Sequence, residues 1–343
     1  MAEVCLGLMI AGLTAYGLLA GADFGAGFWD LTAGGARRGG RVRGMVKRSM
    51  GPVWEANHVW LIFVLVIFWT AFPVAFGSAM STLYVPLFGA MVGIVLRGAA
   101  FALRGQAATM GEARGLGAVF ALSSVLTPFF MGAALGGVAA GEVPVGNAQG
   151  DPWSSWTSPI SLLVGVLAVA TGAYLSAVFL AGDSERAGLP DLVAAFRARA
   201  LGAAVVTGLL AAAGLAVVSS DAPDLFDGLT SGGGLVCVIV SGVAGAATLA
   251  LLWTGRFFLA RFGGALAVAG VTVGWVFAQS PYLLPGELTL DQAAAGDATL
   301  TATLVSVALG LVVLLPSLWL LYSLVLRGRL DQAYEPLDQR FRP

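Results

Sequence analysis

The sequence predicts an all-α integral membrane protein with about nine transmembrane helices. Three observations lead to this fold class: hydrophobic residues make up 58% of the 343 positions, charged residues make up only 11%, and long apolar stretches recur along the chain. Soluble domains carry roughly a quarter charged residues, so a chain this apolar could not cover a water-facing surface. A lipid bilayer is therefore its expected solvent.

Each span needs roughly 20 apolar residues, because a helix rises about 1.5 Å per residue and the hydrocarbon core is about 30 Å thick. Nine stretches meet this requirement: 4–28, 53–76, 80–103, 115–140, 159–181, 200–219, 233–254, 262–280 and 301–326. They are compatible with two four-helix bundles, at about residues 1–140 and 159–280, a ninth helix and a cytoplasmic tail at 327–343. We expect one membrane domain over residues 1–343, because no segment between spans is long enough for a soluble domain.

The basic residues predict the orientation. After the first span, the segment 37–48 carries six Lys and Arg residues, which belong in the cytoplasm by the positive-inside rule. Alternating from there, seventeen of the eighteen Lys and Arg residues fall in the inner segments: 29–52, 104–114, 182–199, 255–261 and 327–343. The outer segments carry acidic residues and no Lys or Arg. We therefore expect the N-terminus outside and the C-terminus in the cytoplasm.

The composition argues against several functions. A net charge of −1 gives no long-range attraction for nucleic acid. Cys5 and Cys237 lie far apart in apolar stretches, without the spacing of a metal or redox site. His58 is the only histidine, so a haem held by two histidines cannot be built in this chain, and no Cys or His cluster suits zinc, copper or iron–sulfur. We expect no metal or cofactor bound by this chain.

Ionisable side chains inside the predicted spans mark the candidate functional site, because a charge buried in lipid is costly. Asp23 lies in the first span, and Glu55 and His58 lie three residues apart on one face at the start of the second. Arg97 lies about two turns inside the cytoplasmic end of the third span, as the expected counter-charge of a buried carboxylate. A group of such residues at the cytoplasmic half suits a proton relay. A structural ion pair that fixes helix positions would explain the same spacing.

Small residues predict close helix contacts in the same region. Glycines recur four residues apart, a spacing that lets helix backbones approach in lipid: Gly17, Gly21, Gly25, Gly132 and Gly136. Asp23 lies seven residues before Asp30, so both share a face of the helix. Ala26 and Gly27 between them leave that face nearly empty, which predicts room for water.

Four segments resemble subunit II of the cytochrome bd-type quinol oxidases: Gly21–Gly27, Gly51–Leu61 (GPVWEANHVWL), Leu96–Gly98 and Ala278–Pro285. The segment around Glu55 is the most specific, and the length, helix count and orientation agree along the whole chain. The resemblance implies a fold of two four-helix bundles and a peripheral helix.

The resemblance further implies a terminal oxidase of the bacterial plasma membrane that oxidises quinol and reduces dioxygen to water. Its haems, two of b type and one of d type, would be bound by subunit I, a pseudosymmetric partner, so this chain alone is not expected to be catalytic. The family's proton route matches Asp23 and Glu55 here, with His58 where members differ between His and Gln. Trp60 matches a tryptophan near the oxygen-access path. A structural quinone or lipid and small accessory subunits fit the same resemblance.

Two other classes of function stay open. A proton-coupled secondary transporter acting alone would have broken helices near the midplane or two halves of inverted topology, and the sequence gives evidence of neither. A quinone-binding membrane anchor of another redox complex would be told apart by the optical spectrum of the co-purified complex, in which haem d has a distinctive red band.

Overall fold

The structure is a computed structural model that describes residues 1–50, 54–104, 106–327 and 329, with only the backbone described at residues 36–38, 50, 54, 55 and 326. Within this part of the chain, eight helices are long and apolar enough to cross a membrane: α1 (Ala2–Leu31), α6 (Tyr84–Arg104), α7 (Met110–Ala139), α9 (Pro159–Arg186), α10 (Pro190–Asp221), α12 (Gly232–Trp253), α13 (Phe257–Gln279) and α15 (Asp297–Leu326). A bent helix pair raises the count to nine. The predicted fold class is confirmed.

The second predicted span is broken where the sequence suggested one straight helix over 53–76. A short helix α3 (Trp54–Asn57) continues through His58, whose backbone is helical, into α4 (Val59–Ala71). The chain then turns by 119° into α5 (Pro73–Thr82). The cause is Pro73, which has no N–H for the helix before it but suits the first position of the next one. The third span accordingly begins at Tyr84 rather than at residue 80.

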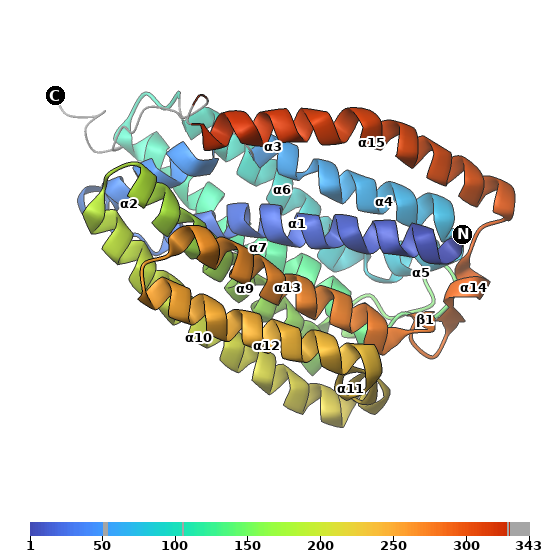
Figure 1. Cartoon of the computed structure of the whole chain (residues 1–343). Helices are drawn as coiled ribbons and strands as arrows, with labels where there is room; N and C mark the ends of the chain where they lie inside the picture. Colours follow the sequence, from blue (N-terminus) through green and yellow to red (C-terminus); the bar gives the residue numbers. More distant parts are fainter. Residues whose placement is uncertain (51–53, 105, 328, 330–343) are drawn as a thin grey trace.

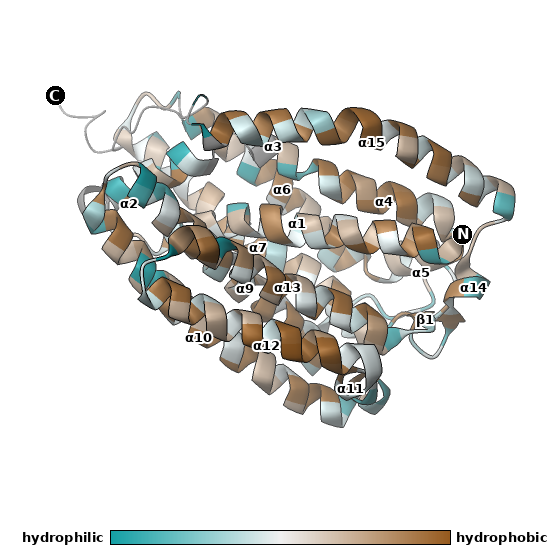
Figure 2. Ribbon diagram, in the orientation of Figure 1, coloured by the Kyte–Doolittle hydropathy of each residue, from teal (hydrophilic) through white to brown (hydrophobic). Residues whose placement is uncertain are grey.

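Helices α1, α7 and α9 pack against one another. Helix α4 lies against α1, α6 against α7, and α10 and α13 against α9, while α12 packs along α13. Helix α15 lies against α4 at the periphery (Figure 1). The division into two four-helix bundles stays a prediction. The N-terminus lies at one end of the molecule, beside β1 and α14, and α15 ends at the opposite end, where α2 lies (Figure 1). Hydrophobic residues follow the lengths of the helices, and hydrophilic ones gather toward the ends (Figure 2). Which end faces the cytoplasm stays a prediction from the charges.

Glycines make close contacts between α9 and its neighbours α1 and α7. A Cβ on Gly25 of α1 would lie 1.8 Å from the carbonyl oxygen of Gly172 on α9, so only glycine fits there. Gly132 and Gly136 of α7 meet the α9 backbone in the same way. The predicted small-residue packing is confirmed at these positions. Gly17 takes no part in it, because no neighbouring atom lies within 4 Å of the point that a Cβ would occupy there.

Short elements that the sequence did not reveal lie between the spans: α2 (Ala36–Met50), α8 (Ser154–Thr157), α11 (Pro223–Thr230), α14 (Leu290–Ala293), and an antiparallel pair of β1 (Tyr282–Leu284) and β2 (Leu288–Thr289). The largest is α2, in the segment predicted as a basic cytoplasmic loop. It buries Val42, Met45 and Val46 in a core shared with α9 and α10.

The end that carries the N-terminus is tied together by its loops. The N–H of Ala295, before α15, donates to the carbonyl of Ala71 at the end of α4 (2.8 Å). The carboxylate of Glu287 accepts from the N–H of Val145 at 3.4 Å.

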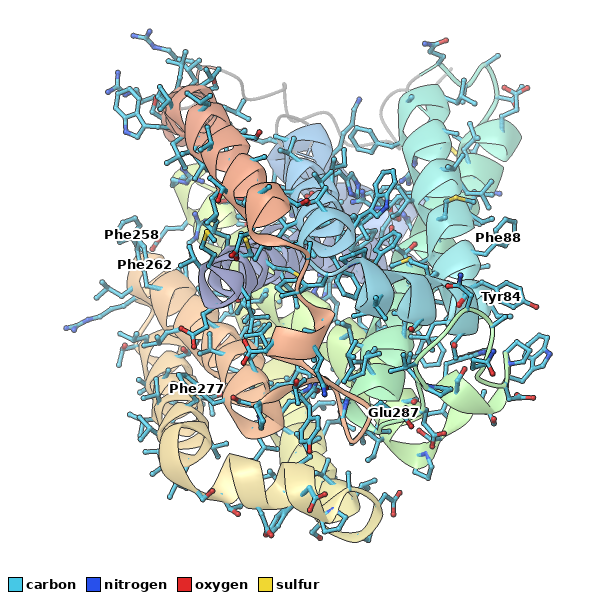
Figure 3. All side chains as sticks on the ribbon, turned by 90° about the vertical axis from the view of Figure 1, so that its right-hand side faces the viewer. Tyr84, Phe88, Phe258, Phe262, Phe277 and Glu287 are labelled. Carbon is cyan, nitrogen blue, oxygen red and sulfur yellow. The ribbon has the colours of Figure 1, made fainter. Side chains whose placement is uncertain are left out.

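Exposed aromatic side chains stand away from the helices on opposite sides of the molecule (Figure 3). They form part of the apolar surface available to lipid or a partner: Tyr84, Phe88, Phe258 and Phe262.

Candidate functional site

A buried carboxylate and a buried amide form the centre of the candidate site. Asp23 of α1 and Asn57 at the end of α3 are each only 2% exposed. The Asn57 Nδ2 group donates a short hydrogen bond to the Asp23 carboxylate and a second, at 3.3 Å, to the carbonyl of Leu19. The chain therefore places a neutral donor at the carboxylate. The importance of Asn57 was not foreseen, although it belongs to the most specific segment of the sequence.

The peripheral helix also reaches this centre. The hydroxyl of Tyr322, on α15, donates to the Oδ1 atom of Asn57 at 2.9 Å. The two residues are 265 positions apart in the sequence, so no local pattern could have joined them. A chain of hydrogen bonds thus runs from Tyr322 through Asn57 to Asp23.

Arg97 lies at the same place, as expected, but it is not the direct ion-pair partner of Asp23. It is 2% exposed on α6, where its NH2 group donates to the main-chain carbonyl of Asp23 at 3.1 Å and its Nε to the hydroxyl of Ser124 at 3.1 Å. Its guanidinium also lies 4.9 Å from the centre of the Phe24 ring and 5.2 Å from that of Phe120. No ion pair within 4.0 Å joins it to the Asp23 side chain, and both residues are fully described.

The expected room for water beside Gly27 is filled by protein. A Cβ on Gly27 would lie 2.2 Å from the Cβ of Ser124, so this glycine is the hollow into which α7 packs. The prediction was wrong because the empty face of α1 is complementary to a neighbouring helix. That same Ser124 holds the Arg97 side chain.

His58 and Trp60 lie beside the site and keep unpartnered ring nitrogens. The His58 ring lies 6.1 Å from the rings of both Tyr16 and Phe24, and its Nδ1 atom is buried without a hydrogen-bond partner among the described residues. Trp60 packs against the cluster formed by Tyr16, Ala20 and Phe24, and its Nε1 atom is likewise buried and unpartnered within the part of the chain that the structure describes. Their functional roles stay predictions.

Glu55, the remaining predicted residue, lies in α3 two positions before Asn57. Its side chain is outside the described residues. That Glu55 lies beside Asp23 stays a prediction from the sequence.

A second buried carboxylate on α1 has a different environment. Asp30 is 3% exposed and forms ion pairs with Arg43 of α2 at 2.7 Å and with Arg104 of α6 at 2.5 Å. Arg43 also donates to the carbonyl of Gly34 at 2.7 Å, so it fixes the turn between α1 and α2. Asp183 of α9 resembles Asp30, because Arg261 and Arg186 both pair with it. Such groups hold helices in place.

The residues present do not suit a haem. A haem held by two histidines needs a second histidine, which the sequence lacks. The rings of Tyr16 and Phe24 lie beside His58. No group of three His, Cys, Asp or Glu side chains that could hold a metal ion occurs among the residues that the structure describes.

Fold and site together define a multi-pass helical membrane protein with ionisable side chains, Asp23 and Arg97, buried between its helices. Comparison with known proteins specifies the class further. Residues 1–325 match the family model described as cytochrome bd terminal oxidase subunit II. The chain belongs to this family, whose members are components of oxidoreductase complexes in bacterial membranes.

Two relatives are similar to this chain over different lengths. The cytochrome bd ubiquinol oxidase subunit 2 of Bacillus subtilis (strain 168) is 30% identical over 114 residues, and this match spans 33% of each protein. A chain in the structure of bd oxidase from Geobacillus thermodenitrificans superimposes with a TM-score of 0.73 at 26% identity, covering 95% of this chain and 98% of that one. The likeness in fold therefore extends over nearly the whole molecule.

Proposed function

We propose that this chain is the haem-free second subunit of a quinol:oxygen oxidoreductase, and that it works beside a haem-bearing subunit I. The proposal is supported by the family match over residues 1–325 and by the likeness to a bd oxidase chain along 95% of the sequence. In the complex, subunit I carries two haems b and one haem d, oxidises quinol and reduces dioxygen to water. The exposed apolar faces of the present chain are available to that partner, to lipid or to a structurally bound quinone.

Within this complex, the chain has two roles. It stabilises the haem-bearing subunit, and it contributes a path for protons from the cytoplasm through Asp23, Glu55 and His58, with Arg97 beside them. Trp60 lies at the same cluster and is assigned to oxygen access. Proton uptake from the cytoplasm, with quinol protons released outside, generates a membrane potential without a pump.

The observation that carries the proton path is the environment of Asp23. Its carboxylate is buried, and its hydrogen-bond donor is the neutral Asn57 amide rather than a cation. A carboxylate can then gain or lose a proton without breaking an ion pair. Arg97, held by Ser124 and by the Asp23 main chain, provides positive charge nearby without neutralising the carboxylate directly. Ionisable groups kept inside a membrane protein in this way are typical of proton relays.

The experiment is to purify the two-subunit complex with Asp23→Asn and to measure quinol-driven oxygen consumption and proton uptake. Asparagine keeps the shape and an acceptor for the Asn57 amide but cannot carry a proton. We expect turnover to fall at least about tenfold, as is usual when a proton-transfer group is removed, while the haem spectrum persists. Asp224→Asn, on the exposed first turn of α11, is the matched control and should leave turnover unchanged. Full turnover and proton uptake in Asp23→Asn would contradict the proton path.

A further inference from the structure

The peripheral helix makes a specific polar contact with the candidate site. The most apolar stretch of α15 contains no buried residue, which makes α15 the most exposed of the spanning helices in the described chain. It nevertheless turns the phenol of Tyr322 toward Asn57, at a point four residues before the helix ends at Leu326. Simple packing of an outer helix does not require a hydrogen bond to a buried amide.

The two ends of the Asn57 amide are not equivalent, and this gives the Tyr322 contact a consequence. One end of an amide only accepts hydrogen bonds, and the other only donates them. Tyr322 donates to the accepting end, while the donating NH2 group faces the Leu19 carbonyl and the Asp23 carboxylate. A backbone carbonyl can only accept, so the Leu19 carbonyl fixes which end of the amide lies there. If the amide were reversed, its oxygen would face Asp23, and only a protonated Asp23 could bond to it. The orientation of Asn57 and the protonation of Asp23 are thus coupled.

Tyr322 acts through Asn57 and not as a member of a proton wire. A neutral amide offers no side-chain atom that readily accepts a proton and releases it again, so a proton from the phenol cannot pass through Asn57 to Asp23. A phenol hydroxyl both donates and accepts, so it does not select which end of the amide faces it; it holds the amide in place beside Asp23. This is the action of a positioning residue.

We infer that Tyr322 is a positioning residue of the proton path: its hydroxyl holds the Asn57 amide against Asp23, and through Asn57 it affects how Asp23 exchanges its proton. The inference rests on the proposed function, and it makes α15 a working part of the site rather than a peripheral addition. The juxtaposition of Tyr322, Asn57 and Asp23 carries it.

The test compares Tyr322→Phe with Tyr84→Phe in the purified two-subunit complex. The first variant removes only the hydroxyl that holds Asn57, and the second removes a hydroxyl from an exposed tyrosine on α6 (Figure 3). We expect Tyr322→Phe to lower turnover roughly two- to tenfold, the range that the loss of one hydrogen bond allows, and to change the pH profile of turnover. Tyr84→Phe should change neither. Unchanged turnover and an unchanged pH profile in Tyr322→Phe would overturn the inference.

A double-mutant cycle locates the effect at Asn57. In an Asn57→Ala background, Tyr322→Phe should change turnover by less than about twofold, because the group that it holds is gone. Independent, multiplicative losses would show that Tyr322 acts elsewhere, and the inference would be wrong.

Failure of the inference and failure of the proposed function give different results. If Asp23→Asn lowers turnover while Tyr322→Phe leaves both turnover and its pH profile intact, the proton path stands and the role of Tyr322 is refuted. If Asp23→Asn leaves turnover unchanged, the proton path fails. The role of Tyr322 is then tested by the infrared band of the Asp23 carboxyl group, which is identified as the band that Asp23→Asn removes. A shift of that band in Tyr322→Phe supports the positioning role, and an unchanged band refutes it.

Discussion

Asp23 and Asp30 lie seven residues apart on helix α1, and both are almost fully buried, yet their surroundings are opposite. Asp30 is held between two arginines from α2 and α6. Asp23 is bonded by the Asn57 amide, and the nearest arginine, Arg97, donates to its main chain instead of its carboxylate. The two residues have the same chemistry and the same helix, so the difference comes entirely from their neighbours.

The proposed function uses this difference to separate a structural carboxylate from an exchangeable one. Removing a buried carboxylate that lies between two cations leaves both cations without a partner. A carboxylate that accepts from a neutral amide has no such partners. Burial alone would have marked both residues as functional, and the partners decide between them.

The largest expected effect on stability is that of Asp30→Asn. Arg43 and Arg104 are only 17% and 15% exposed, so the substitution leaves two largely buried cations without their carboxylate. Breaking such a pair costs about 3–5 kcal/mol, which should appear as poor assembly and a lowered Tm of the purified complex. Asp191→Asn, which breaks the exposed pair with Arg41, should cost less than about 1 kcal/mol. Equal stability of the two variants would erase the proposed distinction.

A smaller effect is expected at Gly25, which lies between the two carboxylates. In Gly25→Ala the new Cβ would overlap the backbone of Gly172, so α1 must move away from α9. Overpacking of this kind costs about 1–3 kcal/mol, and because both carboxylates lie on α1 we expect stability and turnover to fall together. Gly17→Ala, on the same helix with open space around it, is the matched control. Thermal unfolding and oxygen consumption of the two complexes make the measurement.

An effect of similar size is expected for Ser124→Ala, and it tests the role of Arg97. The substitution removes the acceptor of the Arg97 Nε group and leaves a buried charged donor unsatisfied, at a cost of about 1–3 kcal/mol. The freed guanidinium can then turn to the Asp23 carboxylate, which would make Asp23 resemble Asp30 and lower turnover. Ser123→Ala should be close to neutral, because the Ser123 hydroxyl bonds to carbonyls of its own helix. Turnover of Ser124→Ala equal to that of Ser123→Ala would mean that Arg97 has no such freedom.

The sequence predicted what depends on composition and regular spacing. Apolar lengths and glycine spacing predicted the spans and the contacts at Gly25 and Gly136, and the cost of charge in lipid marked Asp23 and Arg97. The turn at Pro73 was missed because a proline within an apolar run is compatible with either a continuing helix or a new one.

The partners of the carboxylates could not be predicted from spacing. Asp30 meets Arg43 and Arg104 from two other helices, and Asn57 meets Tyr322 from the far end of the chain. Such contacts are set by how the helices pack, and a single sequence carries no periodic signal for them. The segment around Asn57 is the most specific one in the sequence, but its ionisable residues Glu55 and His58 indicated a functional site more strongly than the neutral Asn57.

The most direct test of proton exchange at Asp23 is an infrared difference spectrum between the reduced and the oxidised complex. We expect a carboxyl band that changes with the redox state, disappears in Asp23→Asn and is unaffected in any Asp30→Asn complex that assembles. A spectrum in which Asp23→Asn retains every carboxyl band would contradict the claim that Asp23 exchanges its proton during turnover.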